Sequence, residues 1–266
     1  MKSIDLSSPA EAFSKQAPHF DADESSNSIL KEWRQQIYDH VDQYLKPGDR
    51  ILELNAGTGI DALRFAKNNY AVHATDLSQG MIVEIEKKVI QHKLKQFTFE
   101  QCSFHKIDKI NSAKFDYVFS NFGGLNCCSD LTSVTKLLPG LINPNSYVTW
   151  VIMPPICLWE LLWVFKGKKA AFRRLKRNGT VAHLEGEYFK TYYHSLQNIK
   201  KSFGPKFKLI KTEGLGALSP PPASDSFAVK HKTINRWLNY LDKKARNSFP
   251  FNQWADHIIV TFKYIG

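Results

Sequence analysis

The sequence predicts an α/β protein built on a doubly wound, mostly parallel sheet, and three observations support this fold class. Short apolar segments typical of strands alternate with segments of helical periodicity between residues 29 and 153. A glycine-containing loop, residues 55–59, leaves the first predicted strand and enters a helix. The second predicted strand ends on a carboxylate, Asp76. Alternation of this kind places helices on both faces of one sheet.

The elements follow one another in a regular order. A helix over residues 29–45 has apolar residues at helical spacing and ends before Pro47 and Gly48. Strands are predicted over residues 50–54, 71–75, 97–101, 115–119, 146–153, 206–214 and 257–264. Further helices are predicted over residues 60–68, 79–92, 129–138, 195–203 and 233–244. The last two strands are expected to close a seven-stranded sheet as an antiparallel edge.

The order of the elements also predicts a division into three parts. Residues 1–46 are expected to form an N-terminal helical arm or lid, of which residues 1–26 are polar and irregular. Residues 47–155 and 206–266 are expected to form the core. Residues 156–205 interrupt the alternating pattern and are predicted to be an inserted cap over the site, with a long helix and one strand.

Composition excludes several classes of protein. The chain has 266 residues, of which 43% are hydrophobic, and shows no low-complexity tract, which indicates a globular protein. The strongly apolar run at residues 156–165 contains Glu160 and reaches about half the length of a bilayer crossing. Residues 1–20 lack the apolar region of a secretory signal, so a cytoplasmic location is expected. The four cysteines contain no CxxC pair, so reduced thiols are expected. No cluster of His, Asp or Glu has the spacing of metal ligands, so no bound metal is expected.

The positive charge is concentrated in one segment. Net charge is +11, and residues 166–211 alone contain thirteen basic and two acidic residues. The densest part directly follows the aromatic run at 156–165, a junction that could lie on an anionic membrane surface, hold an acidic substrate or bind nucleic acid phosphates. The pattern is more typical of a core-packed helix that emerges into a solvated basic end. The aromatic and basic rim of the cap would consist of Trp159, Trp163, Phe172, Tyr192, Arg173 and Arg174.

The loop over residues 55–59 is the strongest indication of a binding site. Backbone NH groups at the start of a helix can hold a polar cofactor, and glycines allow it to approach closely. Residues 57–62 also satisfy the dinucleotide pattern GxGxxA. Glu53, however, favours a cationic ammonium group over a pyrophosphate. Asp76 can accept hydrogen bonds from both ribose hydroxyls, a feature that NAD and S-adenosylmethionine sites share.

Three segments in order resemble the successive motifs of class I S-adenosylmethionine-dependent methyltransferases of the small-molecule and quinone-methylating type. They are residues 52–63, residues 74–81 (ATDLSQGM) and residues 115–125 (FDYVFSNFGGL). The likeness covers roughly residues 20–153. It implies a Rossmann-like methyltransferase fold, S-adenosylmethionine as the cofactor, S-adenosylhomocysteine as the product and a small-molecule or lipid-like acceptor.

The same resemblance assigns the cofactor contacts. The loop at 53–59 would hold the methionine part, Asp76 the ribose and Leu77 one face of the adenine. The residues after the third strand would meet the adenine edge, those after the fourth would lie near the methyl group, and Phe20 would close over the cofactor. The full set is Phe20, Glu53, Leu54, Asn55, Gly57, Thr58, Gly59, Asp76, Leu77, Met81, Ser103, Phe104, Asn121, Phe122 and Gly123.

The sequence departs from the family pattern at three places. Asn55 stands where the family often has its first glycine, and Asn tolerates left-handed backbone angles better than most residues. Residues 102–104 lack the acidic residue that often meets the adenine amino group. Residues 120–124 lack the Asn/Asp-Pro-Pro-Tyr signature of base-methylating enzymes, which argues against a nucleobase acceptor.

Methyl transfer by in-line displacement depends mainly on alignment, so a general base is optional. The catalytic candidates are His194, Tyr193 and His105, with an ordinary structural role left open for each histidine. Two alternatives from other classes remain: a nucleic-acid-binding protein or RNA methyltransferase that uses residues 166–211, and an NAD-dependent oxidoreductase. The sequence leaves the acceptor atom and the oligomeric state open.

Overall fold

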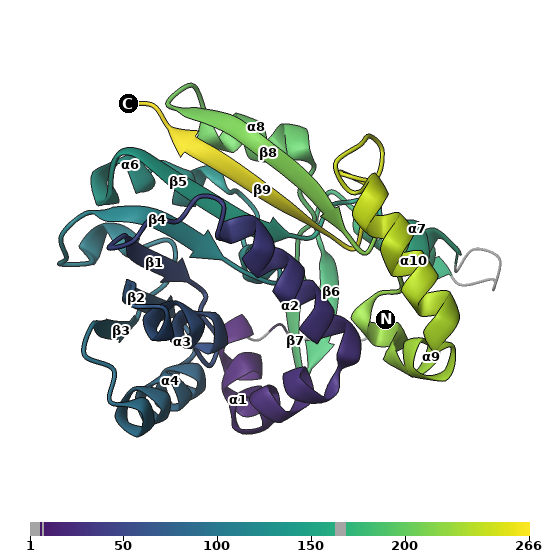
Figure 1. Ribbon diagram of the computed structural model, residues 1–266, viewed down its shortest axis with the longest axis horizontal. Helices are drawn as coiled ribbons and strands as arrows, with labels where there is room; N and C mark the ends of the chain where they lie inside the picture. The colour runs from purple at the N-terminus through teal and green to yellow at the C-terminus, as the bar shows by residue number, and fades with distance from the viewer. Residues whose placement is uncertain (1–5, 7, 163–168) are drawn as a thin grey trace.

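The centre of the molecule is a seven-stranded sheet (Figure 1). A computed structural model describes residue 6, residues 8–162 and residues 169–266. The strands are β1 (Arg50–Leu54), β2 (Ala71–Asp76), β3 (Phe97–Gln101), β4 (Phe115–Ser120), β5 (Ile142–Ile152), β8 (Phe207–Leu215) and β9 (His257–Tyr264). Their order is β3-β2-β1-β4-β5-β9-β8. The predicted seven-stranded, mostly parallel sheet is therefore confirmed.

The pairing of the strands determines where a ligand can bind. β1 pairs in parallel with β2 on one side and with β4 on the other. The order of the strands therefore reverses at β1, with β2 and β3 on one side of it and β4 and β5 on the other. In open α/β sheets, ligands bind in the crevice at the carboxyl ends of the strands where the order reverses. β9 runs antiparallel to both β5 and β8, which confirms the predicted closing edge.

Helices cover both faces of the sheet and bury two separate apolar clusters. One face carries α2 (Ser28–Val41), α3 (Ile60–Lys67) and α4 (Gln79–His92), and its cluster contains Trp33 and Phe65. The other face carries three short helices, whose cluster contains Trp150 and Phe203. These helices are α5 (Thr132–Thr135), α6 (Leu138–Leu141) and α8 (Leu196–Phe203). The last of them, α8, lies in the predicted cap segment but packs into the core of the sheet.

The N-terminal segment differs from the expectation. Residues predicted to be irregular form the helix α1 (Pro9–Ser26), whose first turn is capped by the side chain of Ser8 and begins with a proline. The helix crosses the start of α4 at Gly80, where a Cβ atom would lie 2.6 Å from the carbonyl oxygen of Ser14. Its polar composition concealed it, because α1 packs on neighbouring elements through small residues rather than through a long apolar stripe.

The remaining elements are a two-stranded hairpin and several short helices. A hairpin of β6 (Thr180–Leu184) and β7 (Glu187–Thr191) packs on α1, and its two-residue turn has positive φ angles at Glu185 and Gly186. The strand β6 was not predicted. The long helix of the predicted cap was expected over residues 158–177; the described parts of this range contain two short helices, and residues 163–168 lie outside the described residues. These and the other short helices are η1 (Ile107–Lys109), η2 (Gly124–Cys127), α7 (Leu158–Leu161), η4 (Lys169–Leu175) and η5 (Pro222–Ser224).

Two helices connect β8 to β9. They are α9 (Asp225–Lys230), which the sequence did not predict, and α10 (Lys232–Ala245), which it did. β8 is parallel to β5, since both are antiparallel to β9, so this connection begins and ends at the carboxyl edge of the sheet. Across the described ranges, none of the helices combines the length and the apolar character that a bilayer span requires.

Candidate functional site

A cavity of about 550 Å³ lies at the carboxyl ends of β1, β2 and β4 and is covered by α1. It brings together most of the residues that the resemblance assigned to a cofactor. Those that line it are Phe20, Glu53, Asn55, Gly57, Asp76, Leu77, Met81, Ser103, Phe104, Asn121 and Phe122. Four assigned residues do not line it: Leu54, Thr58, Gly59 and Gly123.

The glycine loop is held in a left-handed conformation at alternate positions. Asn55, Gly57 and Gly59 all have positive φ angles, of 46°, 58° and 78°. Asn55 compensates for the missing glycine by joining β1 to the end of β4, because its Oδ1 accepts a hydrogen bond from the Ser120 hydroxyl at 2.7 Å. The neighbouring loop fits against it only as glycine, since a Cβ atom at Gly124 would lie 2.3 Å from the Asn55 side chain.

Asp76 offers two carboxylate oxygens at the end of β2. The Gly57 amide donates to Oδ2 at 2.9 Å, and the Ser78 amide donates to Oδ1 at 2.8 Å. Each oxygen keeps a further lone pair for a donor in the cavity. Burial raises the pKa of Asp76 to about 6. The arrangement suits two neighbouring hydroxyl donors of a ribose.

Glu53 is a buried carboxylate that lacks a partner for one oxygen. Its side chain lines the cavity, the residue is only 1% exposed, and Oε2 has no hydrogen-bond partner among the described residues. Burial raises the pKa of Glu53 well above its usual range, and the nearby charge of Asp61 raises it further. A cation in the cavity would offset both effects, so this position fits the ammonium group of an amino acid ligand.

A buried charge network behind Phe122 was missed by the sequence analysis. Arg34 forms ion pairs with Asp61 and with Glu24, and all three side chains line the cavity. Burial alone would raise the pKa of Asp61, but the Arg34 charge and hydrogen bonds from Tyr38 and Asn121 lower it. Arg34 lies in α2, four positions after Leu30. This is the ordinary spacing of two residues on one helix face, so nothing in the sequence distinguished Arg34 from an exposed polar residue.

Phe122 links this network to the end of β4. The Arg34 guanidinium lies over its ring, 4.8 Å from the ring centre. Phe122 also has a φ angle of 42°, which is rare for a bulky residue. A side chain held in this way at the mouth of a cavity is typical of a functional site.

The three catalytic candidates are not brought together. His105 lines the cavity, with Nδ1 2.9 Å from the Ser133 hydroxyl. His194 is 7% exposed and does not line the cavity, because its Nε2 lies 2.9 Å from the carbonyl oxygen of Cys128. Tyr193 also lies outside the cavity, with its ring against the Arg174 guanidinium. Of the three candidates, His105 alone lines the cavity.

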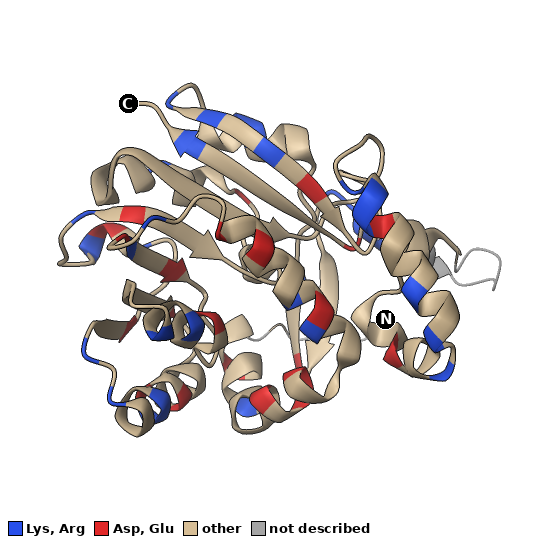
Figure 2. Ribbon diagram, in the orientation of Figure 1, with Lys and Arg blue, Asp and Glu red and all other residues tan. Residues whose placement is uncertain are grey.

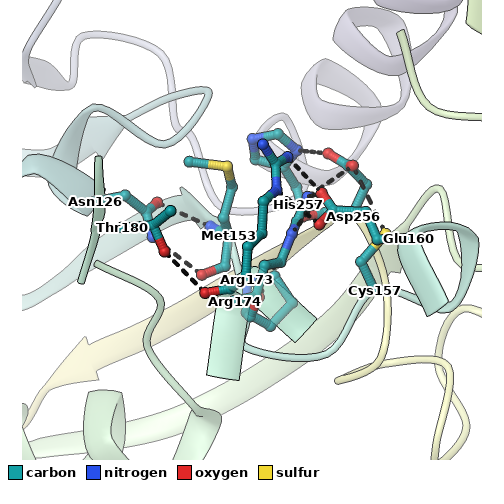
Figure 3. Close-up of polar contacts among 10 residues, drawn as sticks. Asn126, Met153, Cys157, Glu160, Arg173, Arg174, Thr180, Asp256 and His257 are labelled. Atoms are coloured by element: carbon teal, nitrogen blue, oxygen red, sulfur yellow. Dashed lines mark hydrogen bonds and ion pairs between the residues drawn. The ribbon is translucent and has the colours of Figure 1, made fainter. Parts of the chain in front are cut away.

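The predicted basic rim is largely a buried ion-pair cluster (Figure 3). Arg174 Nη2 lies 2.8 Å from Glu160 Oε1 and 3.0 Å from Asp256 Oδ2, and its side chain is 4% exposed. Arg173 pairs with the same glutamate, with Nη2 2.7 Å from Oε1. Cys157, Glu160 and Asp256 also form the one described group with metal-ligand spacing, but Arg174 already contacts both carboxylates.

The described aromatic members of the predicted rim do not line the cavity either. Trp159 packs against Phe227, with ring centres 6.5 Å apart, and Phe172 is 52% exposed. Tyr192 fits against Gly179, where a Cβ atom would lie 2.9 Å from its ring. Trp163 lies outside the described residues. The expectation of an aromatic and basic rim around the acceptor is thus not met by the described members.

The family comparison agrees with the geometry of the cavity. Residues 51–144, which include β1, the glycine loop, Asp76 and the loop after β4, match the family model described as a methyltransferase domain. Residues 51–144 therefore form a methyltransferase domain. The matched range ends early in β5, so the cavity floor belongs to this domain and the cover over it does not.

Individual relatives of the methyltransferase domain show a short sequence match and an extended structural one. A curated demethylmenaquinone methyltransferase of Corynebacterium efficiens is 36% identical over 62 residues, which is 21% of this chain and 26% of that protein. A Methanosarcina mazei structure titled as S-adenosylmethionine-dependent methyltransferase has 14% identity and a TM-score of 0.58, over 85% of this chain and 96% of the other. At such identity the likeness concerns the fold alone.

A third comparison limits what the fold can decide. A structure titled as a (4+2)-cyclase matches 99% of both chains with 12% identity and a TM-score of 0.63. A methyltransferase-like fold therefore also occurs in a protein that is named for a different reaction. Activity has to be argued from the site itself.

Proposed function

We propose that the protein transfers the methyl group of S-adenosylmethionine to a small, largely apolar acceptor. One observation carries this proposal: a single cavity contains an unpaired buried carboxylate, Glu53, and a second carboxylate with two available lone pairs, Asp76. These groups match the ammonium and ribose parts of one molecule. The covering elements add apolar side chains to the same cavity, among them Phe13 from α1 and Leu184 from β6.

The described residues divide the work of holding the cofactor. The Glu53 carboxylate and the cavity-lining residues of the 55–59 loop meet the amino acid part. Asp76 accepts from the ribose, while Leu77 and Phe104 offer apolar surfaces to the base. When bound, S-adenosylmethionine supplies an electrophilic methyl group on a sulfonium sulfur. The chain itself has to align the acceptor with that methyl and exclude water.

His105 is the residue that could take a proton from the acceptor. Burial lowers the pKa of its imidazole, so the ring is neutral near pH 7 and can act as a base. Nδ1 lies next to the Ser133 hydroxyl, which leaves Nε2 for a ligand. An acceptor hydroxyl would need such a base, whereas a thiol, amine or activated carbon needs only positioning.

The deciding test has two stages. Calorimetric titration with S-adenosylmethionine and S-adenosylhomocysteine, with NADH as the comparison ligand, should show micromolar binding of the first two only. Formation of S-adenosylhomocysteine should then be followed with quinol-like, phenolic and lipid acceptors, because the curated relative carries the name of a quinone methyltransferase. Binding of NADH in place of the methyl donor would reverse the assignment. Cofactor binding without turnover on any acceptor would favour a different reaction.

The alternative of nucleic acid binding through residues 166–211 loses support. Arg173 and Arg174, two of the basic residues in that segment, pair with Glu160 and Asp256. An Arg that already pairs with a buried carboxylate has little charge left for a phosphate. Phosphate contacts require such charges to be available at the surface.

A further inference from the structure

The helix α10 exposes large apolar side chains of the kind that are usually buried in a protein core. Ile234, Trp237 and Tyr240 are 50%, 60% and 58% exposed, and Val229 at the end of α9 is 52% exposed. Trp237 and Tyr240 are three residues apart and therefore share one face of the helix. The exposed face of α10 is thus its aromatic face.

The opposite face of α10 explains this orientation. Asp242 is 1% exposed and accepts hydrogen bonds from the amides of Gly216 and Leu218, at 3.2 and 2.6 Å, and from the Ser219 hydroxyl. These bonds anchor the helix to the loop after β8 through a polar residue. The apolar residues consequently point outward.

Basic residues are frequent along α9 and α10, where Figure 2 shows several Lys and Arg positions. Residues 225–249, counted from the start of α9, contain six Lys and Arg residues and two acidic residues, Asp225 and the buried Asp242. Lys243 Nζ lies 3.2 Å from Glu32 Oε1 of α2. Lys244 Nζ lies 5.7 Å from the centre of the Tyr240 ring. The face therefore combines exposed aromatic rings with a net positive charge.

We propose that this face of α9 and α10 docks on an anionic lipid surface. Helices that lie in a membrane interface have this composition, with Trp and aliphatic residues in the headgroup region and Lys and Arg against anionic lipids. A second copy of the chain fits poorly, because a two-fold contact would oppose two positive faces. Nucleic acid would gain nothing from the exposed aliphatic side chains of Val229 and Ile234.

The docking face replaces the membrane contact that the sequence suggested for residues 156–177. Two basic residues of that segment form the ion-pair cluster, whereas α10 carries its charges and its rings on the surface. The connection from β8 to β9 also lies at the carboxyl edge of the sheet, the same edge as the cavity. The docking does not depend on methyl transfer. If the proposed function holds, docking would bring the cavity close to lipid-dissolved acceptors.

Co-sedimentation of the full chain with phosphatidylcholine vesicles, with and without phosphatidylserine, tests the proposal. We expect binding at low salt only when phosphatidylserine is present, and a loss of binding as salt is added. Replacing Lys232 and Lys244 together by Gln should weaken binding about 25-fold, since each basic residue near an anionic surface contributes about fivefold. Lys206→Gln with Lys208→Gln is the matched control, because it removes the same charge at the opposite edge of the sheet. That control should change binding by no more than about twofold.

A second variant tests the apolar part of the face. Trp237→Ala should weaken vesicle binding about tenfold, because an exposed indole loses its burial in the interface. Trp237→Phe should retain most of the binding but lose the blue shift of tryptophan fluorescence on addition of vesicles. Because Trp237 is 60% exposed, neither change should affect folding, which thermal denaturation would verify.

Three results would overturn the proposal. The first is the absence of binding to phosphatidylserine vesicles at low salt, or binding that the α10 variants leave unchanged. The second is binding of single-stranded RNA, but not of vesicles, that the Lys232 and Lys244 substitutions abolish. The third is a dimer in solution that Trp237→Ala converts to a monomer, which would identify the face as a contact between copies. Cofactor titration of the same variants should be normal in every case, so the proposed function is tested separately.

Discussion

The two sides of the cavity are built in different ways. On the cofactor side, which comprises residues 50–126, the glycine loop and Asp76 are positioned by the strand ends and loops that carry them. On the covering side, which comprises α1, the β6–β7 hairpin and the neighbouring helices α7 and η4, the fold depends on contacts between distant segments. Arg174 pairs with Asp256, and Lys15 of α1 pairs with Glu187 of β7. Local motifs thus specify the cofactor side, and long-range ion pairs specify the cover.

The largest expected effect tests whether the covering side depends on its buried ion pairs. Arg174→Met leaves Glu160 and Asp256 without their shared cation, which should lower the free energy of unfolding by about 3–5 kcal/mol. Urea denaturation measures this loss. Arg173→Met, with the same charge change at a half-exposed position, should cost only about 1 kcal/mol. Equal losses in both variants would contradict the difference in burial.

On the cofactor side, Asp76→Ala should weaken S-adenosylhomocysteine binding about 100-fold, because two hydrogen bonds to a carboxylate are lost. Calorimetry of the variant and of Asp76→Asn, which retains one acceptor, measures the effect. Since burial raises the pKa of Asp76 to about 6, affinity in the unmodified protein should fall as the pH is lowered below about 6. An affinity that is constant across this range would exclude Asp76 as the acceptor of the ribose.

Glu53→Gln should separate stability from binding. A carboxyl whose pKa is raised by folding costs stability once the pH exceeds its unfolded pKa, so the cost is present at neutral pH and absent in acid. The variant should therefore gain about 1 kcal/mol of stability at pH 8 and lose about tenfold in S-adenosylhomocysteine affinity. Thermal denaturation at two pH values together with calorimetry would show both. A variant that loses stability would mean that Glu53 is a structural residue.

The smallest expected change in cofactor affinity concerns the contact between α1 and the cofactor side. Asp21 of α1 accepts a hydrogen bond from Thr58 and pairs with Lys88 Nζ at 2.6 Å. Asp21→Asn should weaken S-adenosylhomocysteine binding only about threefold, as expected for a half-exposed ion pair. Asp23→Asn on the same helix is the control and should have no effect. A loss as large as that in Asp76→Ala would show that the cover contributes directly to the cofactor site.

The same difference explains what could be predicted from the sequence. The sheet, its order of elements and the role of the 55–59 loop follow from short-range patterns, and Asp76 was located because it ends a strand. Arg34 and Asp61 were missed because each lies on a helix with unremarkable spacing, and only the crossing of α2 over α3 brings them together. The strand β6 was missed because its partner and turn decide its conformation. The helix over residues 233–244 was predicted, but its exposed aromatic face was not, since periodicity does not reveal which side of a helix faces the core.

Gly80 has a consequence beyond the packing of two helices. The absence of a side chain there lets α1 rest directly on the first turn of α4, so this contact fixes how far the cover stands above the floor. Even alanine would force the helices apart. Gly80 does not line the cavity, although α1 carries Phe13 and Phe20 into it. Proteins of this architecture could therefore adjust the size of the molecule they accept by altering a residue that never touches it.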